Sequence, residues 1–312
     1  MEWKKCWISQ NTALTEALRR LRTHGYVFAD TWPCNVTSAH ELGLIEEAGT
    51  VRLPVDVRLH DLAGIRQGLP QQLSLQLYDY VDSTNSAMLR RNQHEVVANH
   101  LMITEFQSAG RGRRGKAWLG DYGRNIAMTL GIEFRSNLNA LGGLSSVVGL
   151  ALVQALELQG IDAQLKWPND VWINEQKLAG ILVELVPTNT GTLAVIGIGV
   201  NVDLSSAQAD KIDQAVTCIR HLGSAVSRDD LVLAICRNIL ENLEVFAHSG
   251  FASFVAAFNA VHCLQNKYAL LLLAGEAQEG IVRGVDVSGG LVFEERGQAR
   301  IVSSGEVSLR PA

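Results

Sequence analysis

A glycine- and arginine-rich loop decides how this sequence is interpreted: Gln107-Ser-Ala-Gly-Arg-Gly-Arg-Arg-Gly-Lys-Ala-Trp118. An apolar run at residues 101–106 comes directly before it and is typical of a β-strand. The three glycines of the loop match the Gly-x-Gly-x-x-Gly pattern of dinucleotide-binding proteins by letter. That interpretation requires a helix that begins inside the motif, and the Gly-Asp-Tyr-Gly at 120–123 cannot continue one. The stretch therefore predicts a loop between two strands.

The charge of this loop suits an anionic ligand. Its cations are Arg111, Arg113, Arg114 and Lys116. Glycine lets backbone N–H groups approach an oxyanion, and guanidinium groups bind phosphate or carboxylate through paired hydrogen bonds. A solvated run of charges is the simpler alternative. The position between an apolar strand and Trp118 favours a flexible lid over a bound anion.

A second cluster, Lys166-Trp-Pro-Asn-Asp170, interrupts a predicted strand. Because Pro168 cannot donate to a β-ladder, we expect the side chains beside it to face a cavity. A lysine there can neutralise charge that develops as pyrophosphate leaves, and an aspartate can hold Mg²⁺. Taken alone, the motif is equally typical of a plain Asx-Pro turn.

Three weaker motifs accompany these two. Lys177-Leu-Ala-Gly-Ile-Leu-Val-Glu184 predicts a strand in which Ala179-Gly180 leaves room for a flat ligand. Ser83-Thr84-Asn85 lies at a predicted helix start, where it would ordinarily be an N-cap. Gly197-Ile-Gly-Val-Asn201 lies at a strand end, and its glycines predict the close approach of a planar group.

Composition limits the class of protein. The 312 residues are 47% hydrophobic and 19% charged, which is sufficient for two or three domains with buried cores. A net charge of −5 argues against a protein built mainly to hold nucleic acid. The five cysteines form no Cys-x-x-Cys pair, which favours reduced thiols over disulfides or structural zinc. No signal-peptide core is evident, and the apolar stretch at 144–158 is too short to span a bilayer, so we expect a cytoplasmic protein.

The chain is predicted to have three parts. Residues 1–70 contain a helix at 12–23, a strand at 26–28 and an irregular stretch at 30–50. Residues 71–264 mix strands with helices and carry all five motifs. Residues 265–312 form a small all-β unit, with short strands predicted at 268–273, 279–287, 290–294 and 299–302.

In this order the five motifs resemble those of the biotin–protein ligase family, the biotin–[acetyl-CoA-carboxylase] ligases and bifunctional repressors of the biotin operon. The resemblance covers residues 77–312 and includes Gly280–Leu291 and Gly305–Arg310. It implies an α/β (α+β) fold: a class II aminoacyl-tRNA synthetase-like domain with a mixed sheet, then an SH3-like β-barrel. It also implies activation of biotin by ATP, with Mg²⁺, to biotinoyl-5′-AMP, and transfer to a lysine of a biotin carboxyl carrier protein. A homodimer is left open.

The resemblance also implies the site residues. Those for biotin are Ser83, Thr84, Asn85, Gln107, Arg111, Gly112, Arg113 and Lys177. Those for ATP or the adenylate are Arg111, Arg113, Arg114, Trp118, Lys166, Asn169, Asp170 and Asn201, with Asp170 also the magnesium ligand. Lys166, Lys177 and Arg113 are expected to act in catalysis. Buried hydroxyls and amides suit the ureido group of biotin, and a lid protects an acyl-adenylate from water.

The N-terminal part resembles a shortened winged helix-turn-helix. Residues 8–26 resemble its recognition helix and residues 51–59 its exit strand, whereas the seven residues before Ile8 leave no room for the first helix and its turn, and residues 30–50 lack the usual glycine-rich wing. A helix-turn-helix needs its first helix across the DNA backbone, so the sequence favours a degenerate remnant that packs on the catalytic domain over operator binding. Two alternatives to the ligase are a lipoate–protein ligase and a biotin-sensing repressor without catalysis. The arginine loop and the C-terminal β unit favour biotin, and the retained lysines, Lys166 and Lys177, favour an enzyme.

Overall fold

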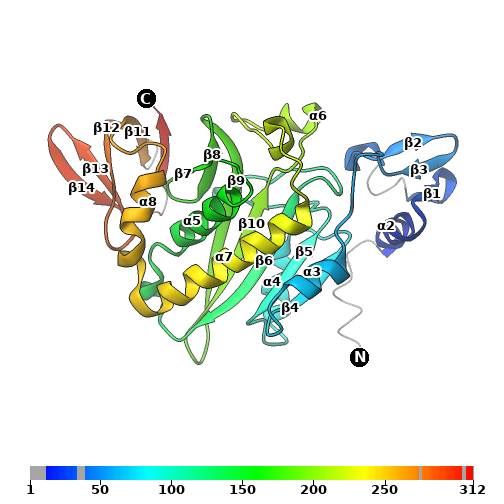
Figure 1. The fold of residues 1–312 in the computed structure, drawn as a ribbon, viewed down its shortest axis with the longest axis horizontal. Coiled ribbons are helices and arrows are strands. Elements are labelled where there is room, and N and C mark those ends of the chain that lie inside the picture. The colour runs from blue at the N-terminus through cyan, green and yellow to red at the C-terminus, as the bar shows by residue number, and fades with distance from the viewer. Residues whose placement is uncertain (1–11, 34–38, 274–275, 304–306, 312) are drawn as a thin grey trace. The chain divides into compact units, whose positions relative to one another are not determined.

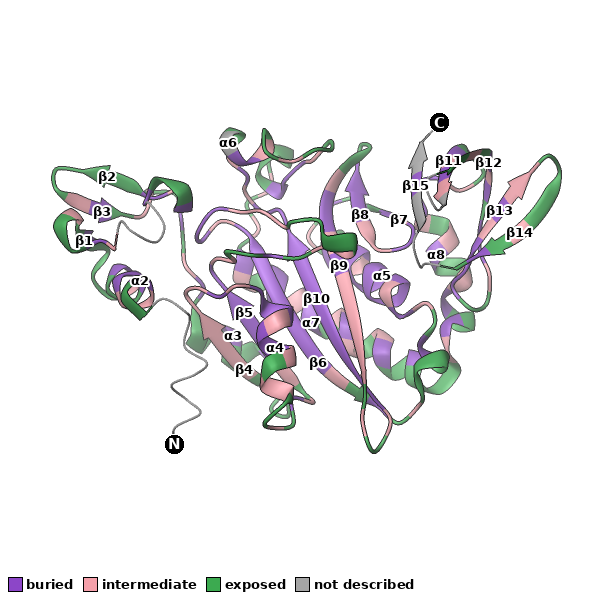
Figure 2. Ribbon diagram, turned by 180° about the vertical axis from the view of Figure 1, so that it is seen from behind, coloured by how far each residue is buried: buried purple, intermediate pink, exposed green. Residues whose placement is uncertain are grey.

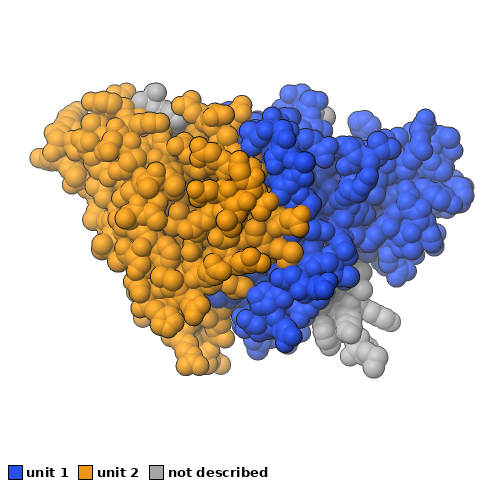
Figure 3. Space-filling view, in the orientation of Figure 1, with its two compact units in different colours: residues 1–132, 195–229 blue, residues 133–194, 230–312 orange. Residues whose placement is uncertain are grey.

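The computed structural model describes residues 12–33, 39–273, 276–303 and 307–311. Tertiary contacts divide the chain into two compact units, residues 1–132 with 195–229 and residues 133–194 with 230–312 (Figure 3). Each unit draws on two separated stretches of chain. The predicted boundaries near residues 70 and 264 stay predictions.

The described part of the first unit begins with a helix and a small sheet (Figure 1). Helix α2 (Thr12–His24) turns one face inward, formed by Leu14, Ala17, Leu18 and Leu21. These apolar residues recur at three- and four-residue spacing, which places them on one side of a helix. Strands β1 (Tyr26–Phe28), β2 (Ile45–Glu47) and β3 (Thr50–Arg52) form an antiparallel sheet in the order β1-β3-β2.

The prediction that residues 30–50 are irregular was wrong for the β2–β3 hairpin. Ala48 and Gly49 both adopt positive φ, 50° and 74°, as the tight turn between two antiparallel strands requires. The Glu-Glu-Ala-Gly turn lacks the Asn-Gly or Asp-Gly pair that would have marked it in the sequence. Residues 8–11, part of the predicted recognition-helix stretch, lie outside the described residues, as do Cys6 and Cys34.

The mixed sheet contributes strands β4 (Ser74–Tyr78), β5 (His100–Thr104), β6 (Ile126–Phe134) and β10 (Thr192–Val200) to the first unit, in that order. β4 and β5 are parallel, and β5 and β6 are antiparallel. β10 is buried along its whole length and β6 along most of it (Figure 2). Burial on both faces explains why these strands are continuous apolar runs. The helices here are α3 (Leu62–Gly68), α4 (Thr84–Asn92) and α6 (Ser206–Ala209).

The second unit holds three neighbouring strands of the mixed sheet, β9 (Gln176–Pro187), β8 (Asp170–Ile173) and β7 (Gln164–Lys166), in that order. Asn174 and Glu175 have φ of 47° and 62° and form the predicted hairpin turn. Helix α5 (Leu144–Glu157) packs against β7, β8, β9 and α8 (Val255–Val261). Nearly all of its side chains are buried. Helix α7 spans Arg228–Ser249.

The C-terminal part of the second unit is an antiparallel sheet in the order β14-β13-β12-β11-β15. Its strands are β11 (Tyr268–Leu273), β12 (Glu276–Val285), β13 (Leu291–Glu295), β14 (Gln298–Val302) and β15 (Val307–Pro311). The four predicted strands are confirmed, and β15 is an addition to them. The start of the Gly305–Arg310 motif lies outside the described residues.

One helical segment of the described chain, Leu138–Glu157, is long and apolar enough by composition to cross a membrane. The stretch expected at 144–158 is extended at its start by a 3-10 turn at Leu138–Leu141. Within the most apolar window of the segment, 61% is buried inside the protein. This burial is that of a core helix, since α5 fills the interior of the second unit.

Candidate functional site

Three buried polar residues open helix α4. Ser83, Thr84 and Asn85 are 2%, 4% and 3% exposed, although each carries a polar side chain. Ser83 is the N-cap, and its hydroxyl accepts a hydrogen bond from the Ser86 N–H. Thr84 donates both its backbone N–H and its hydroxyl to Oε1 of Gln107, at 2.8 and 3.1 Å. The helix start and the start of the arginine loop therefore share one polar group.

Asp82 connects the same two segments through its carboxylate and its backbone carbonyl. Its carboxylate accepts from the Ser83 N–H at 2.7 Å and from both terminal nitrogens of Arg90 at 2.6 and 2.7 Å. Its backbone carbonyl accepts from the Ala109 N–H at 2.8 Å. Partial burial raises the pKa of the Asp82 carboxyl, but the hydrogen bonds from Arg90 and from the Ser83 N–H, together with the positive charge of Arg90, more than offset this, so the net pKa is lowered.

The arginine loop is a closed hairpin. The Gly112 N–H donates to the Lys116 carbonyl at 2.7 Å, and the Trp118 N–H donates to the Gly110 carbonyl at 2.8 Å. At its tip Arg114 has a φ of 57°. Gly110 has no room for a side chain, because a Cβ there would lie 2.5 Å from the Trp118 carbonyl oxygen. The backbone of the expected flexible lid is thus paired along its length in this structure.

The two glycines of β10 face side chains of the protein itself. A Cβ on Gly197 would overlap the side-chain amide of Asn85, and one on Gly199 would overlap the indole of Trp118. Asn85 also accepts from the Thr129 hydroxyl at 2.7 Å. The predicted close approach of planar groups is confirmed, and those groups are an amide and an indole. Three of the five motifs, at 83–85, 107–118 and 197–199, therefore meet in the first unit.

Asn201, at the end of β10, is buried and holds the chain that follows. Its side-chain N–H donates to the Thr217 carbonyl at 3.1 Å, and its own carbonyl accepts from the Ile219 N–H at 3.0 Å. It is 3% exposed. The residue thus braces the 217–219 segment against the strand end.

The remaining two motifs meet in the second unit. Lys177 Nζ lies 2.8 Å from Asp170 Oδ1, and both side chains are less than a fifth exposed. Lys166 Nζ lies 3.9 Å above the ring of Trp172, which is within cation–π distance. Asn169 donates to the Ile181 carbonyl at 2.8 Å. The structure therefore brings the predicted lysine and aspartate of two motifs into one ion pair.

Trp167 has a structural role within its motif. It is 1% exposed, and its indole N–H donates to the Gly289 carbonyl at 3.0 Å. The peptide bond between Trp167 and Pro168 is cis. Lys166, Asn169 and Asp170 are half-buried, so these three are the members of the motif with exposed surface.

Comparison with known proteins decides the family. A model of the biotin/lipoate A/B protein ligase family matches residues 77–201. The bifunctional ligase/repressor BirA of Escherichia coli (strain K12) is 32% identical over 241 residues, 77% of this chain and 75% of BirA. The chain belongs to the biotin–protein ligase family. A second member, the biotin–[acetyl-CoA-carboxylase] ligase of Paracoccus denitrificans, is 32% identical over 72% of this chain and 96% of its own length.

A solved structure of the family confirms the fold class. The biotin protein ligase from Aquifex aeolicus in complex with biotin and ATP aligns with 77% of this chain and 99% of its own, at 26% identity and a TM-score of 0.65. The expected mixed α/β architecture, with a large mixed sheet and a C-terminal antiparallel sheet, is therefore confirmed. The family predicted from the five ordered motifs is confirmed as well.

Within this biotin–protein ligase family member, the described residues contain no group of three or more His, Cys, Asp or Glu side chains that could hold a metal ion. Of the described cysteines, Cys218, Cys236 and Cys263 are free and buried. Burial raises the pKa of the Cys236 thiol to about 12 and that of Cys263 to about 11. The thiols of Cys236 and Cys263 are therefore protonated at neutral pH.

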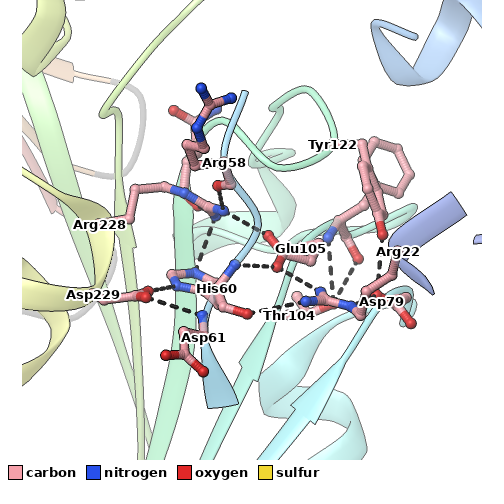
Figure 4. Close-up of polar contacts among 12 residues, drawn as sticks. Arg22, Arg58, His60, Asp61, Asp79, Thr104, Glu105, Tyr122, Arg228 and Asp229 are labelled. Atoms are coloured by element: carbon pink, nitrogen blue, oxygen red, sulfur yellow. Dashed lines mark hydrogen bonds and ion pairs between the residues drawn. The ribbon is translucent and has the colours of Figure 1, made fainter. Parts of the chain in front are cut away.

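Sequence reasoning missed a buried polar network in the first unit of this ligase (Figure 4). Its centre is Glu105, one residue beyond β5, and its partners include Arg22, His60 and Arg228. One local signal was available, since Glu105 is a charged residue inside the apolar run 101–106. A carboxylate in such a run is rare unless it is paired.

Proposed function

We propose that this chain is an ATP-dependent biotin–protein ligase, more narrowly a biotin–[acetyl-CoA-carboxylase] ligase. In the first step the biotin carboxylate attacks the α-phosphorus of ATP, which forms biotinoyl-5′-AMP and releases pyrophosphate. In the second step the amine of a lysine on a carrier protein attacks the acyl carbon of this mixed anhydride. An amide bond forms, AMP leaves, and the amine gives up a proton.

The observation that carries this proposal is the buried contact between Thr84 and Gln107. It joins the Ser83-Thr84-Asn85 helix start to the first residue of the arginine loop. Buried hydroxyl and amide groups need hydrogen-bonding partners, and a site built from them rejects a ligand that lacks matching polar atoms. The ureido group of biotin has both donors and acceptors, so it matches these side chains.

The loop is proposed to bind the two anionic parts of the ligands. Arg111, Gly112 and Arg113 would hold the biotin carboxylate and the phosphate it becomes joined to, because guanidinium groups and glycine N–H groups donate to both. Arg114 and Trp118 would contact the adenylate, together with Asn201. Protection of the mixed anhydride from water is the proposed purpose of the lid.

The second unit is proposed to supply the charged catalytic groups. Lys166 would neutralise charge on the departing pyrophosphate, and Lys177 would hold the biotin carboxylate near ATP. Asp170, with Asn169 beside it, would contribute one carboxylate oxygen to a Mg²⁺ ion. Since Mg²⁺ is commonly held by one or two carboxylates together with substrate phosphates and water, a single aspartate fits such an ion. Magnesium would supply charge neutralisation at the phosphates of ATP.

The attacking nucleophile is proposed to belong to the partner, a biotin carboxyl carrier protein such as that of acetyl-CoA carboxylase. The relative from Paracoccus denitrificans is named for that substrate. The reaction then needs no nucleophilic serine or cysteine in this chain, which agrees with the high pKa of the buried thiols of Cys236 and Cys263. The cytoplasm, which supplies ATP and keeps thiols reduced, is the proposed site of action.

The test is ATP-dependent transfer of biotin to a purified carrier domain. We expect biotin on the carrier lysine, release of AMP and pyrophosphate in equal amounts, and no product with a lysine-to-arginine carrier. The same assay with lipoate is the control for the alternative function, a lipoate–protein ligase, which the description of the matched family also covers. Pyrophosphate exchange that responds to lipoate and not to biotin would reverse the assignment.

Biotin-dependent repression is a second candidate activity, and two observations favour it. α2 is followed by the β2–β3 hairpin, and the Escherichia coli relative is named a ligase/repressor. Against DNA binding, the exposed Arg19 and Arg20 of α2 both pair with Glu16, at 2.8 and 3.1 Å. A gel-shift titration with biotin-operon DNA, with and without biotin and ATP, separates the two: binding to scrambled DNA with equal affinity contradicts repression.

A further inference from the structure

Glu105 is a fully buried carboxylate that is bound from three directions (Figure 4). Its Oε1 accepts from Arg22 Nη2 at 2.6 Å and from the His60 backbone N–H at 2.7 Å. Its Oε2 accepts from Arg228 Nη2 at 2.8 Å. Burial raises the pKa of the Glu105 carboxyl, but the attraction of Arg228 and of the other nearby charges more than offsets this, and the net pKa is lowered. Glu105 is therefore an anion at neutral pH.

The partners of Glu105 are themselves held in place. Arg228 Nη1 donates to the Asn125 carbonyl at 2.9 Å and approaches His60 Nε2 at 3.0 Å. Because a guanidinium cannot accept a hydrogen bond, Nε2 of His60 is the acceptor. Nδ1 of His60 then carries the proton and donates a hydrogen bond to Asp229 Oδ1 at 2.5 Å. The network thus extends from α2 to the start of α7 within the first unit.

The backbone of Glu105 forms the base of the arginine loop. Its N–H donates to the Tyr78 carbonyl at 3.0 Å, which continues the strand pairing, and its carbonyl accepts from the Gly123 N–H at 3.1 Å. Residues 106–122 therefore form a loop whose two ends both lie at Glu105. Gln107, which binds Thr84, lies two residues further along the chain.

The returning end of the loop is also bound by the N-terminal part of the chain. The Tyr122 N–H donates to the Leu42 carbonyl at 2.9 Å, and the Tyr122 hydroxyl donates to Asp79 Oδ1 at 3.0 Å. The same oxygen of Asp79 accepts from Arg22 Nε at 2.7 Å. One guanidinium, that of Arg22, therefore reaches both ends of the loop, through Glu105 and through Asp79 with Tyr122.

Packing reinforces these bonds. Tyr122 is 1% exposed and belongs to the same buried cluster as Leu14, Leu18 and Leu21 of α2, and Tyr80 and Phe106 pack against that cluster. Phe106 directly precedes the arginine loop in the chain. Interiors are close-packed, so a side chain that joins such a cluster has little freedom to shift.

We propose that Arg22 and Glu105 are positioning residues of the ligase site, which hold the base of the arginine loop so that Gln107 and the loop arginines keep their places over the ligand. Helix α2, whose sequence resembles a DNA-binding helix, then has a role in the ligase site. The proposal rests on the proposed function for its effect on catalysis. Whether Arg22 holds the base of the loop does not depend on that function.

The test compares Arg22→Gln with Arg20→Gln, an exposed arginine on the same helix. The first readout is amide hydrogen exchange in the full-length protein without ligand. We expect the loop amides of Gly112 and Trp118 to exchange roughly tenfold faster in Arg22→Gln, because a buried charge-assisted hydrogen bond is lost, and to be unchanged in Arg20→Gln. Unchanged exchange in a folded Arg22→Gln protein overturns the proposal.

The second readout is the release of biotinoyl-AMP from the enzyme, measured per active site. We expect release to be roughly tenfold faster in Arg22→Gln, with part of the effect restored in Arg22→Lys. A purely structural role would lower the melting temperature and leave the release rate of each folded molecule unchanged, which contradicts the proposal. If the wild-type protein forms no adenylate, the proposed function fails, and hydrogen exchange still tests whether Arg22 holds the base of the loop.

Tyr122→Phe, which keeps the ring and removes the bond to Asp79, is a second variant that should remain well packed. We expect the same direction of change in both readouts.

Discussion

The side-chain oxygen of Gln107 accepts two hydrogen bonds from Thr84, one from the backbone N–H at 2.8 Å and one from the hydroxyl at 3.1 Å. Thr84 is 4% exposed, so neither donor has water as a ready substitute. The amide nitrogen of Gln107 is oriented as a consequence, because its oxygen is already committed. Thr84 and Gln107, which are 23 positions apart, are thus held together in one buried polar group at the start of α4.

Gln107→Ala is expected to raise the KM for biotin by roughly tenfold to a hundredfold, with a smaller effect on kcat. The substitution removes an amide proposed to bind biotin and leaves two buried donors of Thr84 without a partner. Steady-state carrier biotinylation measures both constants. Gln72→Ala, at an exposed position, is the control and should behave as wild type. An unchanged KM for biotin in Gln107→Ala would contradict the assignment.

Gly199→Ala is expected to destabilise the protein by about 1–3 kcal/mol, because the new Cβ overlaps the Trp118 indole. The displaced indole should also weaken binding of the adenylate. Denaturant unfolding measures the first effect, and calorimetric titration with a non-hydrolysable adenylate analogue measures the second. In a Trp118→Ala background the same substitution should cost much less, since the overlapping group is gone. Equal costs in both backgrounds would rule out the clash as the cause.

Lys166→Gln is expected to lower the rate of pyrophosphate exchange by roughly 10²–10³-fold, because a charge proposed to stabilise the transition state is lost. The KM for biotin should change little, since the lysine is assigned to the phosphates. Lys166→Arg keeps the charge above Trp172 and should retain part of the rate. The exposed Lys211→Gln serves as control. A rate within twofold of wild type for Lys166→Gln would remove this lysine from the catalytic set.

Glu105→Gln is expected to lower the free energy of unfolding by about 3–5 kcal/mol at pH 7, because Arg22 and Arg228 lose their buried counter-charge. The pH dependence follows from the lowered pKa of this carboxyl. A group with a depressed folded pKa stabilises the protein above its ordinary pKa, 4.5, and this contribution is lost as the pH falls through the folded value. Urea unfolding between pH 7 and pH 3 should therefore show a flatter acid decline in Glu105→Gln than in wild type. The exposed Glu46→Gln is the matched control, and identical acid profiles for Glu105→Gln and wild type would refute the role of this charge.

Local patterns were sufficient for most of the secondary structure. The stripe of Leu14, Leu18 and Leu21 predicted α2, and the apolar run of β10 predicted a buried strand. The first pattern works because a helix repeats every three to four residues, and the second because a strand that is buried on both faces is a continuous apolar run. The β2–β3 hairpin was missed for the same reason, since its Glu-rich sequence has neither pattern nor a strong turn pair.

Motif order identified the family, because five short motifs in one sequence carry more information than any of them alone. Which residues of those motifs touch one another is a different question. The ion pair of Lys177 with Asp170 and the stacking of Trp118 on Gly199 involve residues on different strands or loops. Their partners follow from strand register and loop closure, so the sequence predicted the participants and left the contacts undetermined.

The sequence by itself determined the family, the order of most elements and the chemistry of the arginine loop, because each of these depends on residues that are close together in the sequence. Only the tertiary structure decided what holds that loop. Arg22 and Arg228 meet Glu105 from positions 83 and 123 residues away along the chain. Charges so far apart are joined because burial in one core makes an unpaired carboxylate costly, and no local pattern encodes which distant arginine will supply the pair.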